Sequence, residues 1–174
     1  MALTFLLGGA RSGKSALAVR LASEWPGDAV FVATAETRDA EMAERVERHR
    51  AERPAAWTTL EAPLDPLSPV AAADADAFLV LDCLTLWISN LLEAGREADA
   101  IESAVVELAE LAADRAGPTV VVSNEVGLGI VPANEPARRY RDLLGRVNAL
   151  FAERAERTLL VVAGRALELT PPPP

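Results

Sequence analysis

The sequence predicts an α/β fold in which a mainly parallel central sheet is flanked by layers of helices. Two observations support this prediction. Short, continuously apolar runs recur at residues 3–7, 29–33, 77–82, 119–123 and 158–164. Segments with the spacing of amphipathic helices lie between these runs, and that alternation is typical of βαβ units.

The five apolar runs have the composition of strands that are buried on both faces. They read LTFLL, AVFVA, AFLVLD, TVVVS and TLLVVAG, without a regular alternation of apolar and polar residues. Parallel strands that helices cover on both sides have this composition. Ligands bind beyond the carboxyl ends of such strands, so the residues that follow each run are the candidates for a site.

Helices are expected between the strands. Residues 14–24 are rich in Ala and Leu, and residues 37–53 read as a second helix that Thr37 or Asp39 can cap and Pro54 ends. Two further segments have apolar residues at helical spacing, namely Ile101, Val105, Leu108 and Ala112, and Tyr140, Leu144, Val147 and Phe151.

The composition limits the functions that the chain can have. Its 174 residues suit one domain, expected over residues 1–170, with a disordered proline tail at 171–174. The net charge of -9 argues against nucleic acid as a partner, because binding the phosphate backbone depends on Lys and Arg. No apolar run approaches the ~20 residues of a membrane helix. The single cysteine, Cys83, fits the reducing cytoplasm.

A phosphate-binding motif joins the first predicted strand to the first predicted helix. The segment GGARSGKS, from Gly8 to Ser15, fits G-x-x-x-x-G-K-[ST]. Its backbone N–H groups and Lys14 can hold phosphates, and the Ser15 hydroxyl can bind Mg²⁺. Asp82 ends the run FLVLD, where a carboxylate that binds Mg²⁺ or its waters is expected. These features predict a P-loop NTPase-like (RecA-like) fold that binds a nucleoside triphosphate with Mg²⁺.

The only histidine, His49, allows two interpretations. It continues the apolar stripe of the predicted helix, because Met42, Val46 and His49 are spaced four and three residues apart. In the first interpretation it is an ordinary residue at a helix end, where the helix dipole favours it. In the second, Arg50 and Arg53 disfavour a further positive charge, which leaves a neutral ring nitrogen that can attack phosphorus. Spacing alone favours the first interpretation and leaves the second open.

The segment around His49, RVERHRAERPAAWTTLE, resembles the histidine segment of the bifunctional adenosylcobinamide kinase / adenosylcobinamide-phosphate guanylyltransferases of cobalamin biosynthesis. The family pattern is roughly R-[IV]-x-x-H-[KR]-x-x-R-P-x-x-W-x-T-x-E, and each fixed position is met. The resemblance covers nearly the whole chain, from Leu3 to Gly164. Its further segments are GGARSGKS, ATAETRDAEM, DCLTLWISNLL, SNEVGLGIVP, RRYRDLLGRVN and LVVAG.

The resemblance implies two reactions. The first phosphorylates the aminopropanol hydroxyl of adenosylcobinamide with ATP or GTP, and the second transfers GMP from GTP to that phosphate through a GMP-histidine intermediate. His49 and Lys14 are the implied catalytic residues, with Mg²⁺ at Ser15 and Asp82. A corrinoid substrate and a homo-oligomer are also implied, since related enzymes are trimers. The implied nucleotide-binding positions are Gly8, Gly9, Ala10, Arg11, Ser12, Gly13, Lys14, Ser15, Thr34, Ala35, Glu36, Arg50, Ala51, Glu52, Arg53, Glu61 and Asp82.

Two other functions fit the phosphate-binding motif. The chain would then be a small-molecule kinase with one activity, in which His49 is structural, or a nucleotide-dependent switch or ATPase that binds a protein partner. Neither of these functions forms a covalent bond between the protein and a nucleotide. Covalently attached GMP therefore distinguishes the bifunctional enzyme from both.

Overall fold

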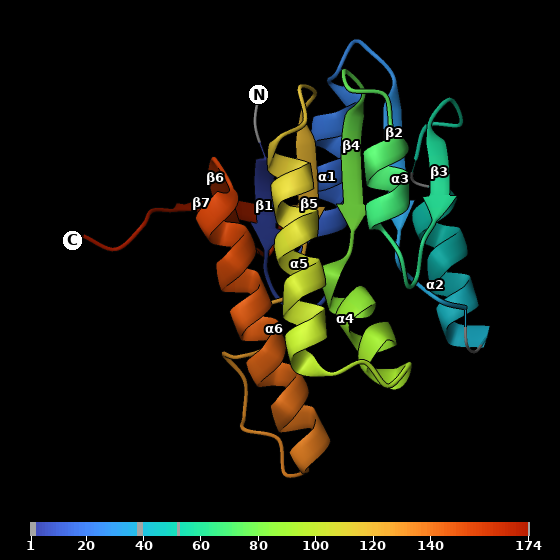
Figure 1. Cartoon of the computed structure of the whole chain (residues 1–174). Helices are drawn as coiled ribbons and strands as arrows, with labels where there is room; N and C mark the ends of the chain where they lie inside the picture. Colours follow the sequence, from blue (N-terminus) through green and yellow to red (C-terminus); the bar gives the residue numbers. More distant parts are fainter. Residues whose placement is uncertain (1–2, 38–39, 52, 174) are drawn as a thin grey trace.

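Figure 1 shows the computed structural model of the chain, in which helices lie on both faces of a central sheet. The structure describes residues 3–37, 40–51 and 53–173. Helices α3, α5 and α6 lie in front of the sheet in this view and α1 lies behind it, while α4 lies below the end of β4 and α2 lies at one side, close to β3. Within the described ranges, no helix combines the length and apolar character that crossing a membrane requires.

Among the described residues, the strands form one sheet with the order β3-β2-β4-β5-β1-β6-β7. Every neighbouring pair is parallel except β6 and β7, which are antiparallel. The parallel strands therefore end at one common edge, the lower one in Figure 1. The strands are β1 (Leu3–Leu7), β2 (Ala29–Ala33), β3 (Thr58–Glu61), β4 (Phe78–Asp82), β5 (Thr119–Val122), β6 (Arg157–Val162) and β7 (Arg165–Leu169).

The helices connect the parallel strands, and their amino-terminal ends follow the carboxyl ends of those strands. Helix α6 begins where the Asn134 side chain accepts a hydrogen bond from the Ala137 amide at 2.8 Å, a typical N-cap arrangement, and Pro136 occupies its first turn. The helices are α1 (Lys14–Ser23), α2 (Ala40–Ala51), α3 (Leu67–Ala72), α4 (Leu84–Glu93), α5 (Ala98–Ala113) and α6 (Glu135–Arg154).

Two apolar clusters hold these layers together. Alternate residues of each central strand face opposite sides, as the two-residue period of a strand requires. In β4, Val80 packs with Ala18 of α1, whereas Leu79 and Leu81 pack with α5 and α6, where Leu108 is fully buried. The larger cluster also holds Phe5 and Phe151, whose rings stack with centroids 5.6 Å apart.

The predicted fold class is confirmed, and the five apolar runs form the buried strands β1, β2, β4, β5 and β6. The sequence analysis missed both edge strands, β3 and β7, and the helices α3 and α4. Strand β7 is exposed along its whole length, and β3 is exposed at both ends, so neither has a continuous apolar run. Helix α3 has only six residues, and α4 follows the apolar run of β4 with Cys83 alone between them, so neither segment stood out as a separate helix.

Candidate active site

The phosphate-binding loop Gly8–Ser15 joins β1 to α1 as the motif requires. The backbone at Gly13 has φ 101°, a left-handed conformation that favours glycine. A methyl group at Gly8 would lie 2.3 Å from the Val161 carbonyl oxygen, so only glycine fits against β6 at this position. Helix α1 begins at Lys14, and its amino-terminal N–H groups and dipole favour an anion at the loop.

Lys14 is buried, with 7% of its surface exposed, and its ammonium group lies inside the loop. It donates hydrogen bonds to the carbonyl oxygens of Gly8 at 2.9 Å and Gly9 at 2.7 Å. The ammonium group is therefore held at the position where the loop would enclose phosphate oxygens. Ser12 is also buried, whereas Gly9, Ala10 and Arg11 are exposed.

A central pocket brings together residues from four separate segments. Ser15 of α1, His49 of α2, Asp82 of β4 and Arg53 line it together. The other residues of this central pocket are Ala35, Met42, Val46, Cys83 and Leu86. The phosphate-binding loop, the carboxylate at the end of β4 and the only histidine are thus part of one site.

The stripe predicted on α2 faces this central pocket. Met42, Val46 and His49 all line it, as their spacing on one helix face predicts. His49 lies in the last turn of α2 and is half-buried, while Arg50 and Ala51 beside it are exposed. Glu52, another predicted nucleotide-binding residue, lies outside the described residues.

Arg53 is held against the face of an aromatic ring. Its guanidinium carbon lies 3.4 Å from the centroid of the Phe31 ring, and Phe31 is a buried residue of β2. Such cation–π contacts orient the planar guanidinium group. The contact with Phe31 therefore holds the charge of Arg53 in place beside the central pocket.

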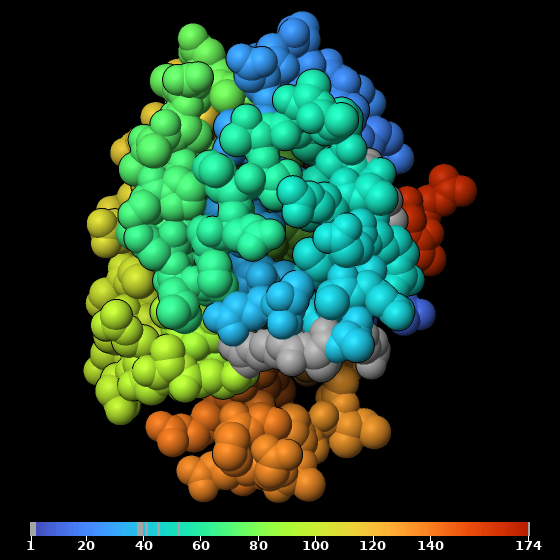
Figure 2. Space-filling model, turned by 90° about the vertical axis from the view of Figure 1, so that its right-hand side faces the viewer, coloured from blue at the N-terminus to red at the C-terminus, as the bar shows by residue number. Residues whose placement is uncertain are grey.

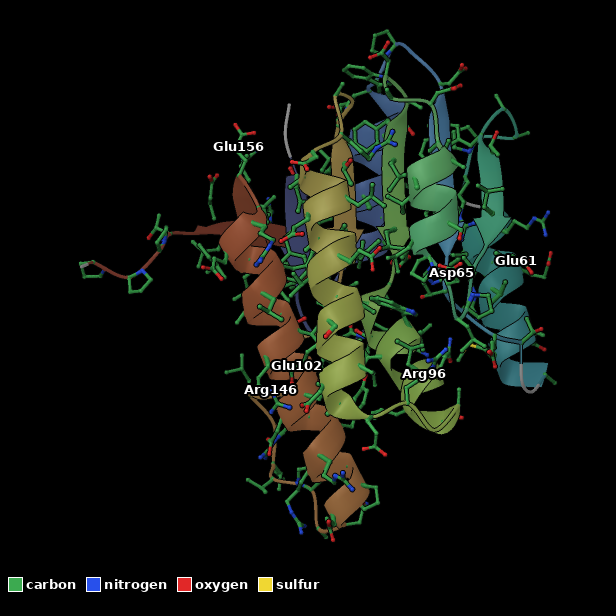
Figure 3. All side chains as sticks on the ribbon, in the orientation of Figure 1. Glu61, Asp65, Arg96, Glu102, Arg146 and Glu156 are labelled. Carbon is green, nitrogen blue, oxygen red and sulfur yellow. The ribbon has the colours of Figure 1, made fainter. Side chains whose placement is uncertain are left out.

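A second, acidic pocket adjoins the central one. It is lined by Ala35, Glu36, Thr37, Val46, Glu61 and Pro63. Ala35 and Val46 line both pockets. Glu61 ends β3, on the right-hand side of Figure 3. Three predicted nucleotide-binding residues, Ala35, Glu36 and Glu61, thus lie around one pocket next to His49.

Thr34, another predicted nucleotide-binding residue, is fully buried between β2 and β4. Its hydroxyl donates to the Cys83 carbonyl oxygen at 2.7 Å and accepts from the Cys83 amide at 2.9 Å. Its backbone amide donates to the Asp82 carbonyl oxygen at 3.1 Å. Thr34 therefore fixes the backbone at Asp82 and Cys83.

Burial of Cys83, together with the charge of Asp82 beside it, raises the pKa of its thiol to about 12. Cys83 is 8% exposed and belongs to the apolar cluster on the α1 side of the sheet. A thiol in this environment stays protonated and is a poor nucleophile. Cys83 therefore behaves as a small buried apolar residue.

A comparison with protein families shows which family the chain belongs to. Residues 4–169 match the model of the family described as cobinamide kinase / cobinamide phosphate guanyltransferase. The chain belongs to this family. The sequence resemblance is therefore confirmed, and the chain is an enzyme of the cobinamide kinase / guanyltransferase type.

Curated relatives cover almost the same length as this member of the family. The bifunctional adenosylcobalamin biosynthesis protein CobP of Pseudomonas aeruginosa is 46% identical over 168 residues, which are 94% of this chain and 95% of that protein. The bifunctional adenosylcobalamin biosynthesis protein CobU of Salmonella typhimurium is 40% identical over 181 residues, covering 96% of this chain and 99% of that protein.

Solved structures that are similar to this kinase / guanyltransferase share its fold at low sequence identity. A type III secretion ATPase of pathogenic bacteria has a TM-score of 0.57 at 14% identity, covering 91% of this chain and 50% of that chain. A KaiC-like protein of Pyrococcus horikoshii has a TM-score of 0.55 at 16% identity, covering 91% and 70%. These similarities confirm the P-loop NTPase-like fold.

A buried polar network beside the phosphate-binding loop was missed by the sequence analysis of this family member. The Ser123 hydroxyl donates to Asn148 Oδ1 at 2.7 Å, and Asn148 Nδ2 donates to the Asn124 carbonyl oxygen at 3.0 Å. The Asn124 amide donates to the Thr85 hydroxyl at 2.8 Å, and the Glu125 amide donates to the Gly8 carbonyl oxygen at 3.1 Å. The network therefore ties the end of β5 to α4, α6 and the phosphate-binding loop.

Proposed function

We propose that this chain phosphorylates the aminopropanol hydroxyl of adenosylcobinamide with ATP or GTP. It then transfers GMP from GTP to the new phosphate, through a covalent intermediate on His49. One observation carries this proposal: His49 lines the same pocket as Ser15 of the phosphate-binding loop and Asp82 of β4. A purely structural histidine would have no reason to share a pocket with both.

The kinase reaction is phosphoryl transfer, in which positioning and neutralisation of charge supply most of the catalysis. The loop Gly8–Ser15 holds the triphosphate with its N–H groups. The Lys14 ammonium exchanges its hydrogen bonds to Gly8 and Gly9 for bonds to phosphate oxygens. The substrate hydroxyl oxygen then forms a bond to the γ-phosphorus and loses its proton to solvent, while the bond from that phosphorus to the bridging oxygen breaks and ADP or GDP leaves.

The guanylyl transfer takes place in two steps at the α-phosphorus of GTP. A neutral ring nitrogen of His49 forms a bond to that phosphorus, the bond to the bridging oxygen of the β-phosphate breaks, and pyrophosphate leaves. An oxygen of the corrinoid phosphate then attacks the same phosphorus. The phosphorus–nitrogen bond breaks, which releases adenosylcobinamide-GDP and restores the imidazole.

The central pocket fits a magnesium-bound nucleotide. The described residues hold no group of three or more His, Cys, Asp or Glu side chains that would bind a metal ion by themselves. A hydroxyl from Ser15 and a carboxylate from Asp82 line the pocket instead, which is the donor set for Mg²⁺ that also binds phosphate oxygens. Mg²⁺ bound there would neutralise phosphate charge.

The acidic pocket supports guanine as the base at the transfer site. Guanine presents ring and exocyclic N–H donors on one edge, where adenine presents a ring acceptor. An ionised carboxylate can accept hydrogen bonds but cannot donate them. Two such groups, those of Glu36 and Glu61, line this pocket. We therefore assign them to the recognition of the base, with Arg50 and Arg53 directed at the phosphates.

Assembly and location complete the proposal. We infer a homo-oligomer, a trimer by resemblance to related enzymes, that works in the cytoplasm. Exposed apolar residues on the loop before α6 support an oligomer, since Leu128, Ile130 and Val131 are 85%, 97% and 61% exposed. This loop and the start of α6 extend beyond the rest of the chain at the bottom of Figure 2.

Incubation with Mg²⁺ and GTP labelled at the α-phosphate tests the proposed function. Wild-type protein should acquire a label that survives denaturing electrophoresis, base and neutral pH, but not acid, as a phosphoramidate does. His49→Asn should lose the label and keep most of the ATP-dependent kinase activity, while Arg48→Gln, on the exposed side of the same turn, should retain both. Wild-type protein that never acquires a label would reduce the chain to a kinase or a nucleotide-dependent switch.

A further inference from the structure

The acidic pocket has two walls, which are the segments that follow β2 and β3 at the edge of the sheet. The parallel register of β2 and β3 runs as far as Ala33 opposite Glu61, and the Ala62 amide adds a bond to the Ala33 carbonyl oxygen at 2.8 Å. Residues 34–37 and 62–66 then continue without helix or strand. The width of the pocket beyond this point therefore depends on side-chain contacts.

Asn90 of α4 provides such a contact between the walls. Its side-chain amide donates to the Thr34 carbonyl oxygen at 2.9 Å and to the Pro63 carbonyl oxygen at 3.0 Å. Thr34 precedes Ala35 and Glu36 on one wall, and Pro63 follows Glu61 on the other. One amide group thus sets the separation of the two segments that carry the carboxylates.

Asn90 is itself held in a rigid position. It is 5% exposed and stands on a helix whose Trp87, Ile88 and Leu91 are buried in the larger apolar cluster. Trp87, one turn earlier, donates from its indole nitrogen to the Leu64 carbonyl oxygen at 3.1 Å. Helix α4 therefore holds the segment 61–65, between Glu61 and Asp65 in Figure 3, at two points.

Thr34 also connects the acidic pocket to the backbone next to Asp82. Thr34 accepts the amide of Asn90 at its carbonyl oxygen, while its hydroxyl is bonded to the backbone of Cys83. Asp82, which lines the central pocket, precedes Cys83. The acidic pocket and the carboxylate at the end of β4 are therefore parts of one hydrogen-bonded unit.

We propose that Asn90 is a positioning residue for guanylyl transfer: by bridging Thr34 and Pro63 it holds Glu36 and Glu61 at the separation that binds the base of GTP. The inference rests on the proposed function, because it assigns the acidic pocket to the nucleotide from which GMP is transferred. It adds a residue that lines neither the central nor the acidic pocket and acts through the two walls.

Two substitutions remove the bridge in different ways. Asn90→Leu keeps a side chain of similar size and removes both donors. Asn90→Asp keeps the shape and places carboxylate oxygens against two carbonyl oxygens, which repels the walls. Asn148→Leu is a matched control, because Asn148 is also 5% exposed and also donates to a backbone carbonyl, that of Asn124, outside the acidic pocket.

The experiment measures, for each variant, the GTP concentration that half-saturates labelling of His49, the KM for ATP in the kinase reaction and the melting temperature. Both Asn90 variants should raise the GTP concentration that half-saturates labelling at least tenfold. They should change the KM for ATP less than threefold. Asn148→Leu should lower the melting temperature by a similar amount, and any change in its GTP dependence should equal the change in its KM for ATP. The ratio between the GTP and ATP effects is the readout that a merely structural role would not change.

Two results would overturn the inference about Asn90. One is an unchanged GTP dependence in a folded Asn90 variant. The other is an equal shift for GTP and ATP in the Asn90 variants, as expected of the control. Failure of the proposed function is a different result, because wild-type protein would then carry no label before any variant is compared.

Discussion

His49 at the end of α2 and Asp82 at the end of β4 line the same pocket, although neither strand pairing nor helix spacing relates them. The sheet order explains the position of Asp82, because β5 alone separates β4 from the β1 strand that leads into the phosphate-binding loop. The position of His49 depends on where α2 packs. A covalent intermediate requires both positions at once.

Asp82→Asn tests the metal-binding part of this relationship. The amide keeps the shape of the side chain and removes its charge, so Mg²⁺-dependent reactions at the pocket should lose roughly 10- to 100-fold in rate. Both the kinase reaction and the labelling of His49 should fall, and a higher Mg²⁺ concentration should restore part of each. Asp142→Asn, an exposed residue of α6, is the control and should change neither rate. Full activity of Asp82→Asn at low Mg²⁺ would exclude a metal-binding role for Asp82.

Phe31→Leu tests whether the aromatic ring holds Arg53. Loss of a cation–π contact costs about 0.5–2 kcal/mol, so labelling of His49 should slow by roughly 2- to 30-fold, while Phe31→Tyr keeps a ring and should label normally. Phe78→Leu is the matched control, because Phe78 is also buried on the α1 side of the sheet and its ring faces Trp25 instead. Equal labelling by Phe31→Leu and Phe78→Leu at equal stability would refute a role for the ring.

The parts of the site that the sequence predicted are those in which the chemistry is local. Gly8–Ser15 and Asp82 are each recognised from a few adjacent residues that follow an apolar run. The face of α2 that carries His49 was predicted because helix spacing is also local. Whether that face meets the phosphate-binding loop depends on tertiary packing, and the spacing could not decide it.

The parts that the sequence could not predict depend on distant partners. Asn90 bonds to residues 56 and 27 positions away, and its own segment carries no signal for either contact. The edge strand β3 was missed for a related reason, since it forms only by pairing with β2. Thr34 was predicted to line the nucleotide site, and its burial against Cys83 became visible only with β2 and β4 side by side.

Gly8→Ala tests the closeness of the phosphate-binding loop to β6. The added methyl group would lie 2.3 Å from the Val161 carbonyl oxygen and 2.8 Å from the Ser12 hydroxyl, at a φ of +154° that side chains rarely adopt. Binding of both ATP and GTP, measured by calorimetry, should be lost or greatly weakened, and the melting temperature should fall. Gly145→Ala in α6, where nothing lies within 4 Å, should stabilise the protein by roughly 0.5–1 kcal/mol. Unchanged nucleotide binding by Gly8→Ala would contradict the loop geometry.

Alkylation of Cys83 tests the burial of the strand end that carries Asp82. Burial raises the thiol pKa from 9.0 to about 12, so at pH 8 the native thiol is both protonated and inaccessible. Iodoacetamide should leave native protein unmodified and active, and should modify one thiol per chain in denaturant, as mass spectrometry would report. A raised folded-state pKa also means that this group's contribution to stability is complete below pH 9.0 and is lost as the pH rises toward 12. Chemical unfolding curves for wild type and Cys83→Ala should therefore converge over that range, and rapid alkylation of the native protein at pH 8 would show that the end of β4 is open to solvent.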